Sequence, residues 1–87
     1  MRVAVISPDR VLFDGDASSV VAPAFDGEVG ILPHHAPMVT LLGKGVLRLD
    51  GGSRQFTVAG GFLQVADDTV RIITESATES NAGPTTG

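Results

Sequence analysis

The sequence contains no cysteine, tryptophan or tyrosine, and its only aromatic side chains are four phenylalanines. Without thiols there can be no disulfide, thiolate metal ligand or cysteine nucleophile, and nothing indicates an oxidising compartment. Sugar-binding sites usually stack rings on aromatic faces, so an adhesive module stays open only as a weaker alternative. We expect the phenylalanines to fill an apolar core: Phe13, Phe25, Phe56 and Phe62.

Positive charge and long apolar runs are also scarce. Six Lys and Arg face ten Asp and Glu, giving a net charge of −4, and no basic cluster occurs, which argues against a nucleic-acid partner. No stretch approaches the roughly 20 apolar residues of a membrane-spanning helix. The apolar run within 1–8 is too short for a signal peptide, and no cleavage site follows it. Any action at a membrane would pass through another protein, without direct lipid insertion.

Glycine and proline are plentiful, with eleven and five residues respectively in a chain of 87. They interrupt the sequence so often that long helices have no room, and short β-branched runs fill the intervals. A chain of this length makes one domain. The pattern predicts an all-β fold, a two-sheet β-sandwich of about eight to ten short strands.

The runs between these breaks give the expected elements. We expect strands at 2–7, 10–13, 18–24, 28–32, 38–42, 46–50, 53–58, 62–66 and 69–75. Turns are expected at 14–16, 43–45, 50–52 and 67–68, and Gly60 and Gly61 permit a kink between two strands. The tail 76–87 has no aliphatic residue larger than alanine, so we predict that it is disordered. The folded domain would then cover 1–75, and removal of the tail should leave its stability unchanged.

The chain is organised around the segment 26–38, which contains two glycines, two prolines and both histidines. Gly27 and Gly30 can adopt positive φ, while Pro33 and Pro37 fix their own φ. The segment predicts a tight turn, a short strand and then a rigid corner. Such a stiff protrusion with a polar tip suits the binding of a partner surface.

This segment resembles the N-terminal β-sandwich domain of the epsilon subunit of the rotary F-type ATP synthase. The family pattern is Gly-Glu-x-Gly-Ile-x-Pro-x-His-x-Pro, matched by Gly27, Glu28, Gly30, Ile31, Pro33, His35 and Pro37. A second family-like segment lies downstream, at Ala59–Val65. The resemblance extends to about Glu75, and it is to a short form, because most relatives continue into a helical hairpin that can block ATP hydrolysis. We therefore do not extend hairpin-mediated inhibition to this chain.

The resemblance implies a non-catalytic rotor subunit of the central stalk. It would link the gamma subunit to the membrane c-ring and couple proton flow to ATP synthesis, at the cytoplasmic face of the inner (plasma) membrane. It implies c-ring contacts at Asp26 and Glu28, and gamma contacts at His35, Met38, Thr40 and Gln64. The structural turn residues would be Gly27, Gly30, Pro33, Pro37, Gly60 and Gly61. His34 stands where the family often has glycine.

Other functions are weaker interpretations of the same residues. Lys44 between two glycines leaves a lipoyl or biotinyl carrier domain as an alternative, although such domains flank the lysine with Asp, Met or Ala. Asp26 and Glu28 lie in a polar turn where solvent keeps both ionised, so acid–base catalysis is disfavoured. Adjacent histidines in an extended segment point apart and cannot chelate one metal. No nucleophile elbow or phosphate-binding loop occurs, and we expect no enzyme activity, metal or cofactor.

Overall fold

The computed structural model describes residues 1–80, which form eight strands and one short 3-10 turn. The strands are β1 (Arg2–Ser7), β2 (Arg10–Asp16), β3 (Val20–Ala24), β4 (Gly27–Ile31), β5 (Met38–Leu41), β6 (Lys44–Leu49), β7 (Arg54–Ala66) and β8 (Thr69–Ser80). The 3-10 turn η1 (Asp50–Gly52) joins β6 to β7. No helix among these residues is long and apolar enough to cross a membrane. The predicted all-β class is confirmed.

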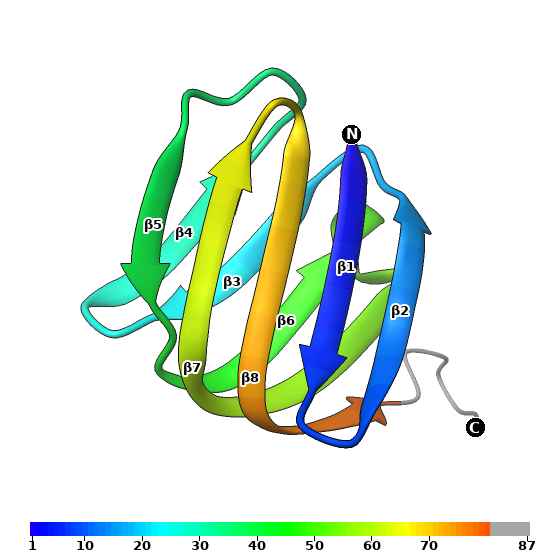
Figure 1. Cartoon of the computed structure of the whole chain (residues 1–87), viewed down its shortest axis with the longest axis vertical. Coiled ribbons are helices and arrows are strands. Elements are labelled where there is room, and N and C mark those ends of the chain that lie inside the picture. Colours follow the sequence, from blue (N-terminus) through cyan, green and yellow to red (C-terminus); the bar gives the residue numbers. More distant parts are fainter. Residues whose placement is uncertain (81–87) are drawn as a thin grey trace.

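The strands form one continuous sheet in the order β2-β1-β8-β7-β6-β3-β4, with β5 added beside β7. Figure 1 shows this sheet folded over into two layers. The β1 layer consists of β2, β1, β5 and the halves of β7 and β8 next to their shared hairpin. The β6 layer consists of β4, β3, β6 and the remaining halves of β7 and β8. The predicted sandwich is confirmed, with its two sheets joined as one ladder through β7 and β8.

The bend between the layers lies at Gly60 and Gly61, whose φ angles are 77° and 106°. A Cβ atom on Gly61 would overlap the backbone oxygen of Ile73 on β8, so this position has no room for a side chain. The hydroxyl of Thr74, which is 2% exposed, lies 3.0 Å from the Gly60 carbonyl oxygen and donates to it. The bend therefore depends on the close approach of the β7 backbone to the β8 backbone at Gly61, and on the hydrogen bond from the buried Thr74 hydroxyl to Gly60.

The core lies between the layers and follows the alternation of the strands. Its largest fully buried side chains are Val3, Val5, Val20, Ile31, Leu47, Leu49, Phe56, Val58, Leu63, Val65, Val70 and Ile72. Complete burial of such a side chain stabilises the fold by roughly 1.5–3 kcal/mol. Phe13 of β2 packs on Phe56 of β7 with ring centroids 6.3 Å apart, which closes one side of the core. Arg54 covers the Phe13 ring from outside, 5.1 Å from its centroid.

Two of the four phenylalanines are not core residues, so that prediction was wrong for them. Phe25 is 66% exposed in the turn between β3 and β4, and Phe62 is 42% exposed on β7. Phe62 lies out of phase with its buried neighbour Leu63, because successive side chains of a strand point to opposite faces.

Several predicted boundaries were also wrong. The expected turn 43–45 is absent, because Lys44 and Gly45 already belong to β6. Lys44 is therefore a strand residue, whereas the carrier interpretation needs a lysine at a hairpin tip. The expected turn 14–16 is the end of β2, and the two strands expected at 53–58 and 62–66 are the single strand β7.

The C-terminal boundary moves as well. Strand β8 runs to Ser80, and residues 76–80 pair with 55–59 of β7. These residues are strand and not tail, because backbone pairing needs no large apolar side chain, and Ala77 packs against the core. The prediction of disorder for 81–87 lies outside the described residues.

Candidate partner-binding site

The β3–β4 hairpin forms the tip of the segment that the sequence singles out. Ala24 pairs with Gly27, which leaves Phe25 and Asp26 as a two-residue turn. Gly27 has φ 132°, a value that side-chain-bearing residues rarely adopt. The Phe25 amide donates to the Leu41 carbonyl at 3.0 Å, which fastens the hairpin to the end of β5. The exposed tip is therefore held in place by the pairing of β3 with β4 and by the end of β5.

The two acidic residues of this hairpin have different surroundings. Glu28 accepts hydrogen bonds from Nη2 of Arg48 at 3.0 and 3.2 Å. The Asp26 carboxylate makes no ion pair within residues 1–80. Of the two predicted c-ring contacts, Asp26 thus has an unshared charge, while Glu28 shares its charge with Arg48. Arg48 alternates with the buried residues Leu47 and Leu49 and therefore points outward, but no local pattern in the sequence connects it to Glu28.

The corner after β4 begins with a β-turn from Leu32 to His35. The His35 amide donates to the Leu32 carbonyl at 3.2 Å, with Pro33 and His34 between them. His34 has φ 66°. Proline followed by a residue of positive φ is the pattern of a type II turn, in which the third position favours glycine. This geometry explains why glycine suits the position, and it means that His34 carries backbone strain.

A second contact holds the corner to the body of the molecule. The His34 amide donates to Oδ1 of Asp68, in the β7–β8 turn, at 2.8 Å. This hydrogen bond lowers the pKa of the Asp68 carboxyl below its ordinary value. The imidazole Nδ1 of His35 lies 2.7 Å from the Ala36 carbonyl oxygen. No group of three or more potential metal ligands occurs in the described part of the chain.

The predicted gamma contacts do not share one face. Met38 pairs with Val65 and Thr40 with Leu63, whose side chains are buried, so Met38 and Thr40 point toward the inside of the sandwich. Gln64 pairs with Val39 and lies on the outer face of the β1 layer. Met38 packs partly against the core. His35 lies separately, in the corner. Only Gln64 and the corner can contact a partner that covers the outer face.

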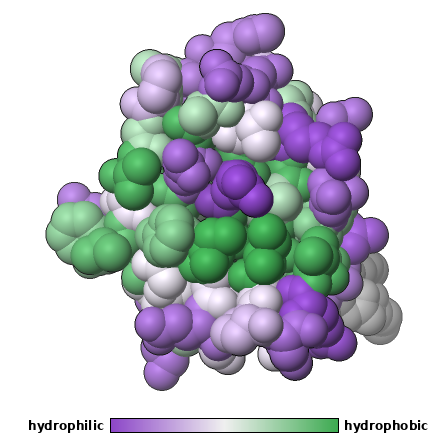
Figure 2. All heavy atoms as spheres, viewed as in Figure 1, coloured by the Kyte–Doolittle hydropathy of each residue, from purple (hydrophilic) through white to green (hydrophobic). Residues whose placement is uncertain are grey.

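An apolar row that the sequence analysis missed crosses this outer face. Neighbouring strands align its members in pairs across five strands: Leu41 with Phe62, Phe62 with Ile73, Ile73 with Ile6, and Ile6 with Val11. Leu41, Phe62 and Val11 are 60%, 42% and 58% exposed. Figure 2 shows a band of hydrophobic residues across the same face.

A further exposed apolar residue and a shallow hollow lie beside the apolar row. Val39 on β5 is 68% exposed, two positions before Leu41. Phe62 and Ile73 line the hollow together with Ile6, Ser7 and Pro8. A contiguous apolar surface of this kind is typical of a protein-binding site. The signal in the sequence was that 38–42 is apolar at almost every position, which is typical of a strand covered on both sides.

Known proteins resemble this chain over nearly all the described residues. Residues 1–80 match the family described as ATP synthase, Delta/Epsilon chain, beta-sandwich domain. An ATP synthase epsilon chain of Exiguobacterium sp. is 48% identical over 80 residues, covering 88% of this chain and 59% of the relative. One of Leptospira borgpetersenii is 46% identical over 77 residues, covering 86% and 61%. The chain thus spans about three fifths of the length of these relatives.

Solved structures agree on the fold. A chain in the cryo-EM structure of the Euglena gracilis mitochondrial ATP synthase, comprising OSCP, F1 and c-ring, superposes with a TM-score of 0.80 at 27% identity. The match covers 88% of this chain and 51% of that one. A chain in the Tetrahymena thermophila mitochondrial ATP synthase central stalk and c-ring gives a TM-score of 0.77 at 20% identity, which supports the fold alone.

Proposed function

The chain belongs to the ATP synthase delta/epsilon family, and we propose that it is a non-catalytic central-stalk subunit that links gamma to the c-ring. In this role it keeps ion flow through the ring coupled to ATP synthesis. It works at the cytoplasmic face of the membrane, as a peripheral part of the complex, and needs no cofactor. The apolar row on a stiff sheet is the observation that carries the proposal.

The apolar row is the surface for gamma. Its side chains are fixed by a ladder of five strands, so docking a partner costs little ordering of the backbone. Burial of one such exposed side chain can contribute up to roughly 1.5–3 kcal/mol. Gln64 lies on the same face and adds a polar contact beside the row. Met38 and Thr40 act from behind, by supporting β5 against Leu63 and Val65.

The tip of the β3–β4 hairpin is the surface for the ring. Asp26 is exposed there with an unshared charge, which a positively charged group on a polar loop of the ring would complement. Glu28 contributes less, because Arg48 already neutralises it in part. Since the tip is solvated, each carboxylate is worth about 0–1 kcal/mol unless the ring desolvates it.

Transmission of torque through this block depends on its continuity. The layers are one hydrogen-bonded ladder, and β7 and β8 each pass through both of them. A load applied at the hairpin tip therefore reaches the apolar row through backbone pairing, without a flexible linker within residues 1–80.

The test is binding to the gamma subunit of the same ATP synthase. We expect Leu41→Asp to weaken binding at least about tenfold, since it places a charge within the apolar contact. The matched control is Thr78→Asp, which adds the same charge at an exposed position of β8 in the other layer. The proposal is wrong if Leu41→Asp binds gamma as the unchanged chain does while remaining folded.

A further inference from the structure

The corner at 33–37 is fixed by a residue that lies far from it in the sequence. Its turn holds His34 at φ 66°, which a glycine would adopt freely and a histidine adopts with strain. Without support, the chain at His34 would relax toward negative φ, and the corner would then lose its direction. The support comes from Asp68, whose Oδ1 accepts the His34 amide at 2.8 Å across 34 positions of sequence.

The turn that carries Asp68 is suited to this contact. Asp67 and Asp68 have φ angles of 53° and 57°, a region that aspartate tolerates better than most residues. The Asp68 carbonyl accepts the Arg2 amide at 3.0 Å, which fixes the turn against the start of β1. The Asp68 carboxylate is thus held on a rigid base, and Figure 1 shows the β7–β8 turn and the β4–β5 connection at the same end of the molecule.

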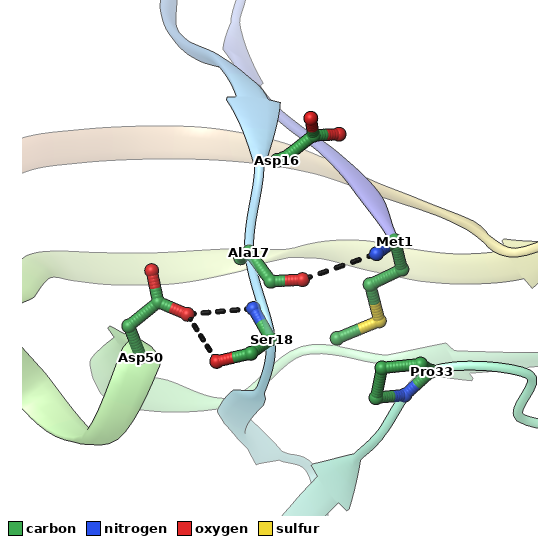
Figure 3. Close-up of a pocket in the computed structure, with 6 residues that line it drawn as sticks. All are labelled: Met1, Asp16, Ala17, Ser18, Pro33 and Asp50. Carbon is green, nitrogen blue, oxygen red and sulfur yellow. Dashed lines mark hydrogen bonds between the residues drawn. The ribbon is translucent and has the colours of Figure 1, made fainter.

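The same arrangement occurs a second time in the fold. Asp50 opens the β6–β7 connection with φ 53°, and its Oδ1 accepts the backbone amide of Ser18 at 2.6 Å and the Ser18 hydroxyl at 2.8 Å (Figure 3). Ser18 belongs to the connection from β2 to β3, which crosses from the β1 layer to the β6 layer. His34 belongs to the connection from β4 to β5, which crosses back. In each case an aspartate in a hairpin turn pins a crossing connection through its backbone amide.

We propose that Asp68 is the positioning residue of the gamma-binding corner, holding 33–37 in the conformation that presents His35 to gamma. This inference rests on the proposed function in one respect, the assignment of gamma as the partner. Asp50 performs the same mechanical task at a connection without predicted contacts. Asp68 therefore affects recognition, whereas Asp50 affects only the fold.

The test compares Asp68→Gly with Asp67→Gly. Both variants remove one carboxylate from the same turn, and glycine accepts the positive φ at either position, so the turn itself is preserved. In the isolated chain, we expect Asp68→Gly to accelerate hydrogen exchange of the His34 amide, while Asp67→Gly leaves it unchanged. With gamma, we expect Asp68→Gly to bind severalfold more weakly than Asp67→Gly, under conditions in which both variants are fully folded.

A third variant separates positioning from general stability. His34→Gly removes the strain from the corner, so adding it to Asp68→Gly should recover much of the lost gamma affinity. A purely structural role of Asp68 would not be rescued in this way. Unchanged exchange of the His34 amide in Asp68→Gly, or no rescue by His34→Gly, would overturn the role of Asp68. Failure of the unchanged chain to bind gamma would instead overturn the proposed function, and the exchange result would still decide whether Asp68 holds the corner.

Discussion

His34, Asp50, Asp67 and Asp68 are the residues other than glycine that have positive φ within 1–80. Three of them are aspartates in hairpin turns, and two of these use the carboxylate to hold a distant backbone amide. The glycines with positive φ lie at the remaining sharp points of the chain. Single residues thus fix where the strands turn and which connections are held down.

Gly61 is the glycine at which addition of a single methyl group should lower the stability of the fold most. Its Cβ would overlap backbone atoms of β8, and its φ of 106° disfavours any side chain. We expect Gly61→Ala to destabilise the fold by at least roughly 1–3 kcal/mol. Urea unfolding measures the change. Gly30→Ala is the control, because no atom lies within 4 Å of its added Cβ, and its free energy of unfolding should change by less than about 1 kcal/mol.

The aspartates that pin the connections make stability sensitive to acid. Hydrogen bonds from Ser18 to Asp50 and from His34 to Asp68 lower the pKa of both carboxyls below the ordinary value of 3.8. A group with a lowered pKa stabilises the fold above its ordinary pKa, and the contribution is lost as the pH falls through the folded value. The α-amino group of Met1 faces both carboxylates, and His34 faces Asp68, so positive charge adds to the effect.

Stability should therefore be level from pH 7 to about pH 5 and fall below about pH 4. Urea midpoints across this range measure it. The variant Asp50→Asn should show a shallower fall, since it has lost one of the two carboxylates. A stability that rises as the pH drops below 4 would contradict the assignment.

At the scale of elements, β7 and β8 differ most from the strands that neighbour them. Each is at least twelve residues long and passes through both layers, while no other strand exceeds seven. The C-terminal half of β7 pairs with β5, and its N-terminal half pairs with β6. The N-terminal half of β8 pairs with β1, and its C-terminal half forms an edge of the β6 layer. Residues 76–80 are thus a structural part of the β6 layer.

Truncation after Ser76 should consequently lower the melting temperature, contrary to the expectation from composition. The truncated chain loses the pairing of 77–80 with 55–58 and uncovers Val58. We expect a loss of at least about 1 kcal/mol, or about 4–8 °C for a domain of this size. Calorimetry measures it. Glu79→Ala is the control, because it removes only the exposed ion pair with Arg54 and should cost about 0–1 kcal/mol.

The sequence predicted those features of the strands that are determined by neighbouring residues, and it did not predict those that depend on pairing with a distant strand. Strand β1 and the outward position of Arg48 follow from alternation, and the bend at Gly60 and Gly61 follows from glycine itself. The extension of β8 could not be predicted, because residues 76–80 are held by pairing with a distant strand and not by their own apolar content. The exposed apolar row combines side chains from five strands, so its signal is split over segments that each look like core.

The candidate site was predicted to a similar extent. The turn, the corner and the carboxylates at 26–38 were identified, because glycine and proline act on their own segment. The partners of that segment were missed. Arg48 lies 20 positions from Glu28, and Asp68 lies 34 positions from His34, so neither pairing leaves a local trace.

At the scale of the whole molecule, one stiff body carries two separate surfaces, and we assign each of them to a different partner. The apolar row lies on the outer face of the β1 layer, and the β3–β4 hairpin projects beyond its edge at β5 (Figure 1). The hairpin is tied to that layer by the hydrogen bond from Phe25 to Leu41. A partner on the row and a partner at the tip can therefore bind at the same time.

Cysteine crosslinking in the reconstituted ATP synthase tests this central claim most directly. The chain has no cysteine of its own, so each introduced thiol is unique. Asp26→Cys should crosslink to a cysteine in a c-ring polar loop, and Gln64→Cys to a cysteine in gamma. Thr78→Cys, on the β6 layer, should crosslink to neither. Exchange of the two partners, or failure of both Asp26→Cys and Gln64→Cys to crosslink in a complex that contains the chain, would contradict the account.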